Sequence, residues 1–154
     1  MKIERMILIA FFGNYLVNNV AAGLASLVPA TPGGNPILTT QYITFAVLAA
    51  ITTGVMTWWY LKRMSHDGSM MQGLIFGAVG FVVAVLTAFV TGIAGVLLQT
   101  GSIAQVAQVL PNFGPYLWQP TTAILLGVWL IPGALVGWLL QMRMKAPSAQ
   151  SMEM

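Results

Sequence analysis

Four long apolar segments follow one another along the chain, separated by shorter segments that are richer in proline, glycine and polar residues. They cover approximately residues 6–28, 41–61, 72–99 and 121–141. A helix needs about 20 apolar residues to cross the hydrocarbon core of a bilayer. The apolar runs are continuous and do not alternate with a period of two, which disfavours a β-barrel. The pattern therefore predicts an all-α membrane protein with four transmembrane helices in a single domain, residues 1–154.

The distribution of basic residues predicts the topology. All six basic residues flank the start of the first segment, the link between the second and third, or the end of the fourth: Lys2, Arg5, Lys62, Arg63, Arg143 and Lys145. The other two links, residues 29–40 and 100–120, contain no charged residue. Basic residues gather on the cytoplasmic side of membrane proteins. We therefore expect two hairpins with both termini in the cytoplasm.

Composition supports lipid as the solvent of this chain and as its first partner. Hydrophobic residues make up 58% of the sequence and charged residues 6%, with a mean hydropathy of +0.84. A soluble domain carries about 25% charged residues. Six basic residues are too few for a phosphate-binding surface, so nucleic acid is not an expected partner. Small size and the basic bias lead us to expect a bacterial inner-membrane protein.

Three asparagines interrupt the first apolar segment. At 100° per residue, Asn14 and Asn18 form one stripe with Ala21, while Asn19 lies on the neighbouring stripe with Tyr15. Such a polar face is expected to meet protein or water rather than lipid. We interpret these amides as helix-packing residues, since interhelical hydrogen bonds in membranes contribute roughly 0.6 kcal/mol each. The alternative is that they line a polar pathway or a ligand pocket.

Small residues gather on one face of the third segment and, over a shorter stretch, of the fourth. They are Gly73, Gly77, Gly80 and Ala84 in the third segment and Gly133 and Gly137 in the fourth. Such a face lets another helix backbone approach closely. We expect the third segment to use it against the first. Pro132 interrupts the fourth segment and frees the carbonyl of Val128, which predicts a hinge or an ordinary kink. The frequency of proline in membrane helices favours the kink.

Several features have two interpretations. Ser102 can cap a short helix that Pro111 ends, and this helix would lie on the outer membrane surface as an amphipathic helix or pack within an ordered loop. Residues 52–64 resemble residues 132–144, either through duplication or because inner helix ends share Trp and Arg anchors. A cleaved signal ending near Ala30 is disfavoured by the length of the first segment.

The chemistry of enzymes and pumps has no recognisable residues in this sequence. No ionisable residue lies at the depth of the hydrocarbon core, which disfavours proton-driven transport. His66 and Asp67 are too few for a metal site, and cysteine is absent. We expect no catalytic, metal or cofactor site, and a disordered tail at residues 146–154. The predicted function is a non-enzymatic accessory, assembly or structural subunit that packs against itself or a partner membrane protein. The alternative is a small oligomeric channel or facilitator for a small uncharged solute.

Overall fold

Helices form nearly the whole of the chain that the structure describes. The computed structural model describes residues 3–29, 39–65 and 68–145, and within them no β-strand occurs. The elements in order are α1 (Ile3–Ala25), α2 (Thr40–Tyr60), the π-helix η2 (Leu61–Ser65), α3 (Met70–Thr100), α4 (Ile103–Val109), the 3-10 helix η3 (Leu110–Asn112), α5 (Phe113–Leu117) and α6 (Pro120–Lys145). Four of these helices are long and apolar enough to cross a membrane. The all-helical prediction is thereby confirmed, and the composition of these helices fits a multi-pass membrane protein.

Local signals set the ends of the long helices. Thr39 caps α2 by accepting a hydrogen bond from the Tyr42 N–H at 3.2 Å. Ser69 caps α3 by accepting one from the Gln72 N–H, also at 3.2 Å. Gly101 ends α3 with a φ of 63°, in the left-handed region that glycine adopts without strain. These ends lie within a few residues of those expected from the hydrophobic pattern.

Parts of three predictions lie outside the described residues. The disfavoured cleavage site near Ala30 falls there, and so do the His66–Asp67 pair and the tail 146–154. The short helix expected after Ser102 is present as α4. Ser102 occupies its N-cap position, but its hydroxyl makes no capping hydrogen bond.

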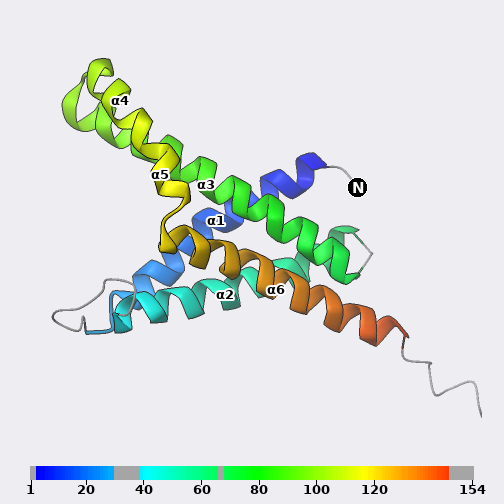
Figure 1. Ribbon diagram of the computed structural model, residues 1–154. Coiled ribbons are helices and arrows are strands. Elements are labelled where there is room, and N and C mark those ends of the chain that lie inside the picture. Colours follow the sequence, from blue (N-terminus) through cyan, green and yellow to red (C-terminus); the bar gives the residue numbers. More distant parts are fainter. Residues whose placement is uncertain (1–2, 30–38, 66–67, 146–154) are drawn as a thin grey trace, which may run out of the picture.

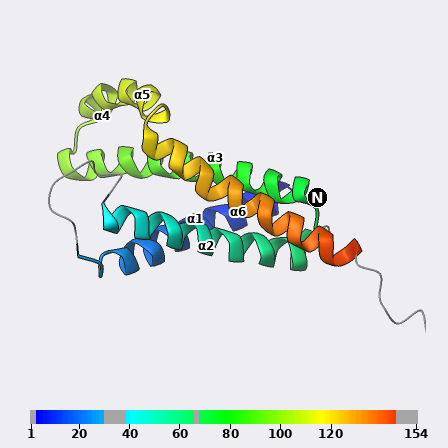
Figure 2. The ribbon, with the colours of Figure 1, turned by 60° about the horizontal axis from the view of Figure 1, so that its bottom comes forward.

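The four long helices pack side by side, as Figure 1 shows. Contacts join α3 with α6, α2 with α6, α1 with α2, and α1 with α3. In Figures 1 and 2, α1 begins and α6 ends at the same end of the bundle. The C-terminal part of α3 diverges from α1 and α2 at the opposite end and is accompanied by α4. We call the first of these ends the basic end, because Lys62, Arg63 and Arg143 lie there.

Aromatic side chains fill the centre of the bundle. Trp129, Tyr60 and Phe76 are each at most 1% exposed and belong to one apolar cluster with Met6 and Leu61. The rings of Tyr60 and Phe76 stack with centroids 4.7 Å apart and planes 18° apart, which joins α2 to α3. This cluster therefore draws on α1, α2, α3 and α6 together.

Glycines let α3 and α6 touch through their backbones. A methyl group added at Gly73 would overlap the carbonyl oxygen of Gly133, and one at Gly77 would lie 2.6 Å from the carbonyl oxygen of Trp129. One added at Gly137 would lie 2.9 Å from the Cα of Met70. Only residues without a Cβ fit at such contacts. The partner of the glycine face of α3 is thus α6 and not the first helix, because α6 carries its own glycines at the matching height.

Candidate functional site

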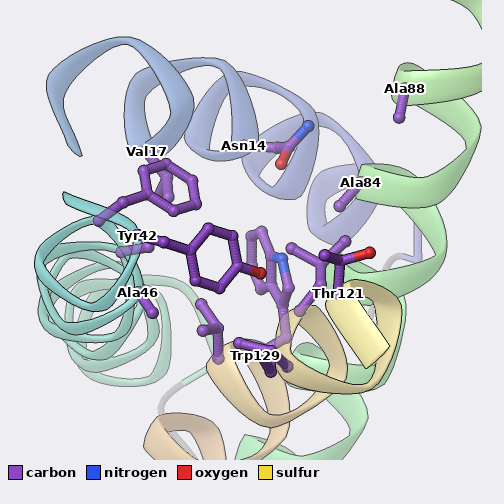
Figure 3. Close-up of a pocket in the computed structure, with 13 residues that line it drawn as sticks. Asn14, Val17, Tyr42, Ala46, Ala84, Ala88, Thr121 and Trp129 are labelled. Carbon is purple, nitrogen blue, oxygen red and sulfur yellow. The ribbon is translucent and has the colours of Figure 1, made fainter. Parts of the chain in front are cut away.

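A cavity of about 230 Å³ lies between the four long helices, toward the end opposite the basic end (Figure 3). Tyr42 and Thr121 line it from the first turns of α2 and α6, and Trp129 lines it from farther along α6. Such a volume holds roughly seven water molecules or one small organic molecule. The cavity is therefore large enough for a ligand and is partly open to the surroundings.

Short side chains make the space. Ala46 and Ala49 of α2 and Ala84 and Ala88 of α3 line it, where larger residues would fill it. The remaining wall is apolar or aromatic: Val17, Phe45, Ile124, Leu125, Val128 and Trp129. Figure 3 shows the ring of Tyr42 reaching from α2 toward Trp129 of α6. The cavity thus has a mainly apolar lining with a few polar groups, the composition typical of small-molecule sites.

Asn14 supplies the amide of this cavity. Its side chain is 2% exposed, and Figure 3 shows it extending from α1 on the side that faces α3. The same face of α1 buries Met6, Ala10, Val17 and Ala21. A buried amide must exchange its water for other hydrogen-bond partners, because an unmatched polar group costs about 1–3 kcal/mol. Asn14 is accordingly both a packing residue of α1 and a polar group at the cavity wall.

The other two asparagines differ in position. Asn19 is exposed on the outer face of α1, where its amide donates a 2.8 Å hydrogen bond to the carbonyl of Tyr15 in the same helix. Tyr15 itself is 67% exposed. The backbone of Asn18 lies within α1, but its side chain is outside the described part of the structure. The structure therefore separates Asn14 from Asn19, on opposite faces of one helix.

The predicted small residues and the predicted kink lie away from most of this cavity. Gly73, Gly77, Gly133 and Gly137 form the α3–α6 contact toward the basic end, and Gly80 makes room for the ring of Trp129. Ala84 is the one member of the predicted set, besides Asn14, that lines the cavity. Pro132 lies inside a continuous α6, and its Cβ would be 3.6 Å from a methyl group added at Gly54 of α2. It is thus placed at the α2–α6 contact.

Sequence reasoning missed Tyr42, Thr121 and Trp129. Tyr42 and Thr121 gave one signal in the sequence: both are polar residues in the first turn of an apolar segment, where a side chain can make contacts near that end of the helix. Trp129 carried none, because a tryptophan in the middle of a transmembrane helix looks like any large apolar residue. What brings them together is the packing of α1, α2, α3 and α6, which no local pattern reports.

The chemistry that this cavity offers is hydrogen bonding within an apolar enclosure. Its polar groups are an amide, a phenol, a hydroxyl and the indole N–H of Trp129. Within residues 3–29, 39–65 and 68–145, no three His, Cys, Asp or Glu side chains group together to hold a metal ion. The arrangement fits binding of an uncharged molecule better than binding of an ion. Comparison with protein-family models, with curated proteins and with solved structures found no match to this chain.

Proposed function

We propose that the protein is a non-enzymatic multi-pass membrane protein that acts as an assembly or accessory subunit, binding a neighbouring transmembrane helix through the outer face of α1. The observation that carries this proposal is the stripe of polar and small residues on that face. It consists of Tyr15, Asn19, Ala22 and Ser26, all exposed. We call it the outer α1 stripe.

The outer α1 stripe is unlike a lipid-facing surface. Many other exposed positions of the long helices carry large apolar residues, such as Leu16, Val47 and Val82, although α3 also exposes Ala88, Thr91 and Gly92. In hydrocarbon, polar side chains are costly unless they find partners, and small residues favour close helix contact. The Ser26 hydroxyl, like the Asn19 amide, reduces this cost by donating to its own helix, at 2.7 Å to the carbonyl of Gly23. The stripe therefore fits a second helix better than it fits lipid.

Asn19 sets the expected strength of this contact. Its bond to Tyr15 uses one of the four hydrogen-bonding positions of an asparagine amide. An interhelical hydrogen bond in a membrane contributes roughly 0.6 kcal/mol and at most about 1.7 kcal/mol. The amide would thus orient an association that close packing at Ala22 and Gly23 mainly stabilises.

The proposal includes the topology of the chain. Arg5, Lys62, Arg63 and Arg143 are all exposed, and they lie in the first turns of α1, in η2 and in the last turn of α6, at the basic end. We place this end in the cytoplasm, in a bacterial inner membrane, by the positive-inside rule. The helices then form two hairpins, α1–α2 and α3–α6, and α4 lies as an amphipathic helix at the outer surface. Cysteine variants of Ser102 and Arg63 should react with a membrane-impermeant maleimide from opposite sides.

Cysteine cross-linking tests the association directly, because the chain has no cysteine of its own. The variant Ala22→Cys should form a disulfide-linked product on mild oxidation of native membranes. A product of about twice the 16.5 kDa chain mass identifies a second copy, and any other mass identifies a partner membrane protein. Adding Asn19→Leu should weaken association roughly 3- to 20-fold, while Asn19→Gln should weaken it less.

The matched control is Ala78→Cys, another exposed alanine replaced by the same residue on α3. It should give no product, because its surroundings are apolar and face lipid. Equal cross-linking at Ala78 and Ala22 would mean random collision and would contradict the proposal. Absence of a product at Ala22 would contradict association with a second copy through this face, because each copy supplies one of the two thiols that a disulfide needs.

The cavity favours a second candidate function, a facilitator for a small uncharged solute. An Asn14-lined space between four long helices is the start of a conduit or a binding pocket. The test is solute flux into liposomes that contain the purified protein. The variant Ala88→Phe, which fills the cavity, should abolish flux that the unchanged protein supports. Flux that is insensitive to Ala88→Phe would not pass through this cavity.

A further inference from the structure

A second hollow lies at the basic end, between the C-terminal ends of α2 and α6. Two cationic side chains border it: Lys62, which follows α2 in η2, and Arg143 of α6. Its walls and floor are apolar or aromatic: Trp58, Leu61, Leu140 and Met144. Gly68 completes the lining, and none of the carboxylates among residues 3–29, 39–65 and 68–145 belongs to it. We call this hollow the basic groove, and its volume is about 290 Å³.

The two helices contribute matching sets of side chains. Trp58, Leu61 and Lys62 are spaced i, i+3, i+4, and so are Leu140, Arg143 and Met144, so each set faces one way from its helix. Both cations stand within a turn of a helix C-terminus, where exposed carbonyls favour positive charge. The groove is therefore built from both helices, with one cation from each.

The position of Lys62 is organised before any ligand arrives. Its Nζ lies over the ring of Trp58, 5.0 Å from the centroid, a cation–π arrangement. The π-helical turn that begins at Leu61 contains Lys62 as well. Single π-helical turns are rare in proteins overall, and where they occur they are often at functional sites. The ammonium is thus held beside the groove while remaining exposed.

From this geometry we propose that the basic groove binds the phosphate headgroup of an anionic phospholipid. Arg143 provides a planar guanidinium that matches phosphate oxygens in a two-point contact, and Lys62 provides a point charge beside it. Below them, Leu61 and Leu140 offer an apolar floor for the glycerol and the first acyl carbons. Trp58 belongs at the headgroup level, where indole rings concentrate. Basic pockets between transmembrane helices are suited to such headgroups.

The charge pattern favours this occupant over an apolar helix. A helix laid in the groove would remove both cations from water without supplying a counter-charge, at a cost of several kcal/mol for each. An anionic headgroup supplies that charge and keeps the site at the interface. The proposal needs only that the long helices cross a membrane, and it is independent of the outer α1 stripe.

Native mass spectrometry of the detergent-solubilised full chain tests the proposal, with dioleoyl-phosphatidylglycerol as the probe and dioleoyl-phosphatidylcholine as the neutral competitor. The unchanged protein should retain phosphatidylglycerol selectively. The double variant Lys62→Gln/Arg143→Gln should bind it roughly 30-fold more weakly, about fivefold for each cation. The matched control is Arg5→Gln/Arg63→Gln, which removes two exposed cations that do not line the groove and should change affinity less than threefold.

Each outcome decides the proposal. Unchanged retention in the groove variant, or an equal loss in the control variant, would overturn it, because general positive charge would then explain the binding. If millimolar sodium phosphate displaced phosphatidylglycerol as well as added phosphatidylglycerol does, the proposal would also be overturned, because the groove would then be a site for free phosphate. The charge-conserving variant Lys62→Arg/Arg143→Lys should retain phosphatidylglycerol. This variant can be measured even if the glutamine variant does not fold. Loss of phosphatidylglycerol binding in it would contradict the proposal that two cations hold the headgroup.

Discussion

The variant Gly77→Ala tests whether backbone contact between α3 and α6 stabilises the bundle. The added methyl group would lie 2.6 Å from the carbonyl oxygen of Trp129 and 3.3 Å from the Cα of Leu130. Ordinary contacts of a Cβ begin near 3.4 Å. The neighbours are backbone atoms of a helix and not the ends of flexible side chains, so the two helices must separate by roughly 1 Å to accept the methyl group.

The separation would weaken the neighbouring contacts too. A gap of 0.5–1 Å forfeits about a quarter to a half of the dispersion energy of each affected atom pair. The Gly73–Gly133 contact lies about one turn away on the same helices and would open with it. Overpacking of a tight contact costs about 1–3 kcal/mol. We expect a loss of this size in the free energy of unfolding of the purified protein.

Gly92→Ala is the matched control. Gly92 lies on the same helix, but a methyl group there would have no atom of the described residues, beyond its own surroundings in α3, within 4 Å. Both variants gain the same helix propensity, about 1 kcal/mol, so the difference between them isolates packing. Thermal unfolding in dodecyl maltoside should show Gly77→Ala melting several degrees below Gly92→Ala. Equal melting temperatures would refute the reasoning, since the glycine contact would then not stabilise the bundle.

Three further variants test the interior. Thr53→Val should leave stability unchanged or raise it by about 1 kcal/mol, because the buried Thr53 hydroxyl has no hydrogen-bond partner in the part of the chain that the structure describes. Thr57→Val should lower stability by a similar amount, because it removes the 2.8 Å bond from the Thr57 hydroxyl to the Thr53 carbonyl. Thermal unfolding compares the two variants. Trp129→Ala should cost about 3–5 kcal/mol, because this fully buried ring fills the space that Gly80 leaves, and an unchanged denaturation midpoint would contradict its place in the core.

The long helices could be predicted from the sequence because their causes are local. A continuous apolar run is readable in a single segment, and so is a capping residue such as Ser69 before α3. The closing glycine Gly101 is another local signal, since its left-handed φ is a property of one residue. Such signals need no knowledge of what lies across the bundle.

Helix partners could not be predicted in the same way. A small-residue face on α3 fits any helix that can approach closely, and both α1 and α6 carry small residues. The choice of α6 depends on Gly133 and Gly137 standing at the height of Gly73 and Gly77, which is a property of two helices together. The assignment of Asn14 to the interior and Asn19 to the exterior likewise depends on the rotation of α1. Neighbouring helices set that rotation through Val17, Ala10 and Ala21.

The two ends of the bundle follow from how small residues are distributed along α3. Toward the basic end they are glycines that meet glycines or backbone of α6, so the helices touch and leave no space between them. One to two turns farther, Ala84 and Ala88 meet no glycine of α6, and the ring of Trp129 enters over Gly80. Beyond that ring α3 diverges, and the cavity opens between it, α1 and α6. The close α3–α6 contact and the cavity are thus separated along α3, so a molecule bound in the cavity would leave the glycine contact in place.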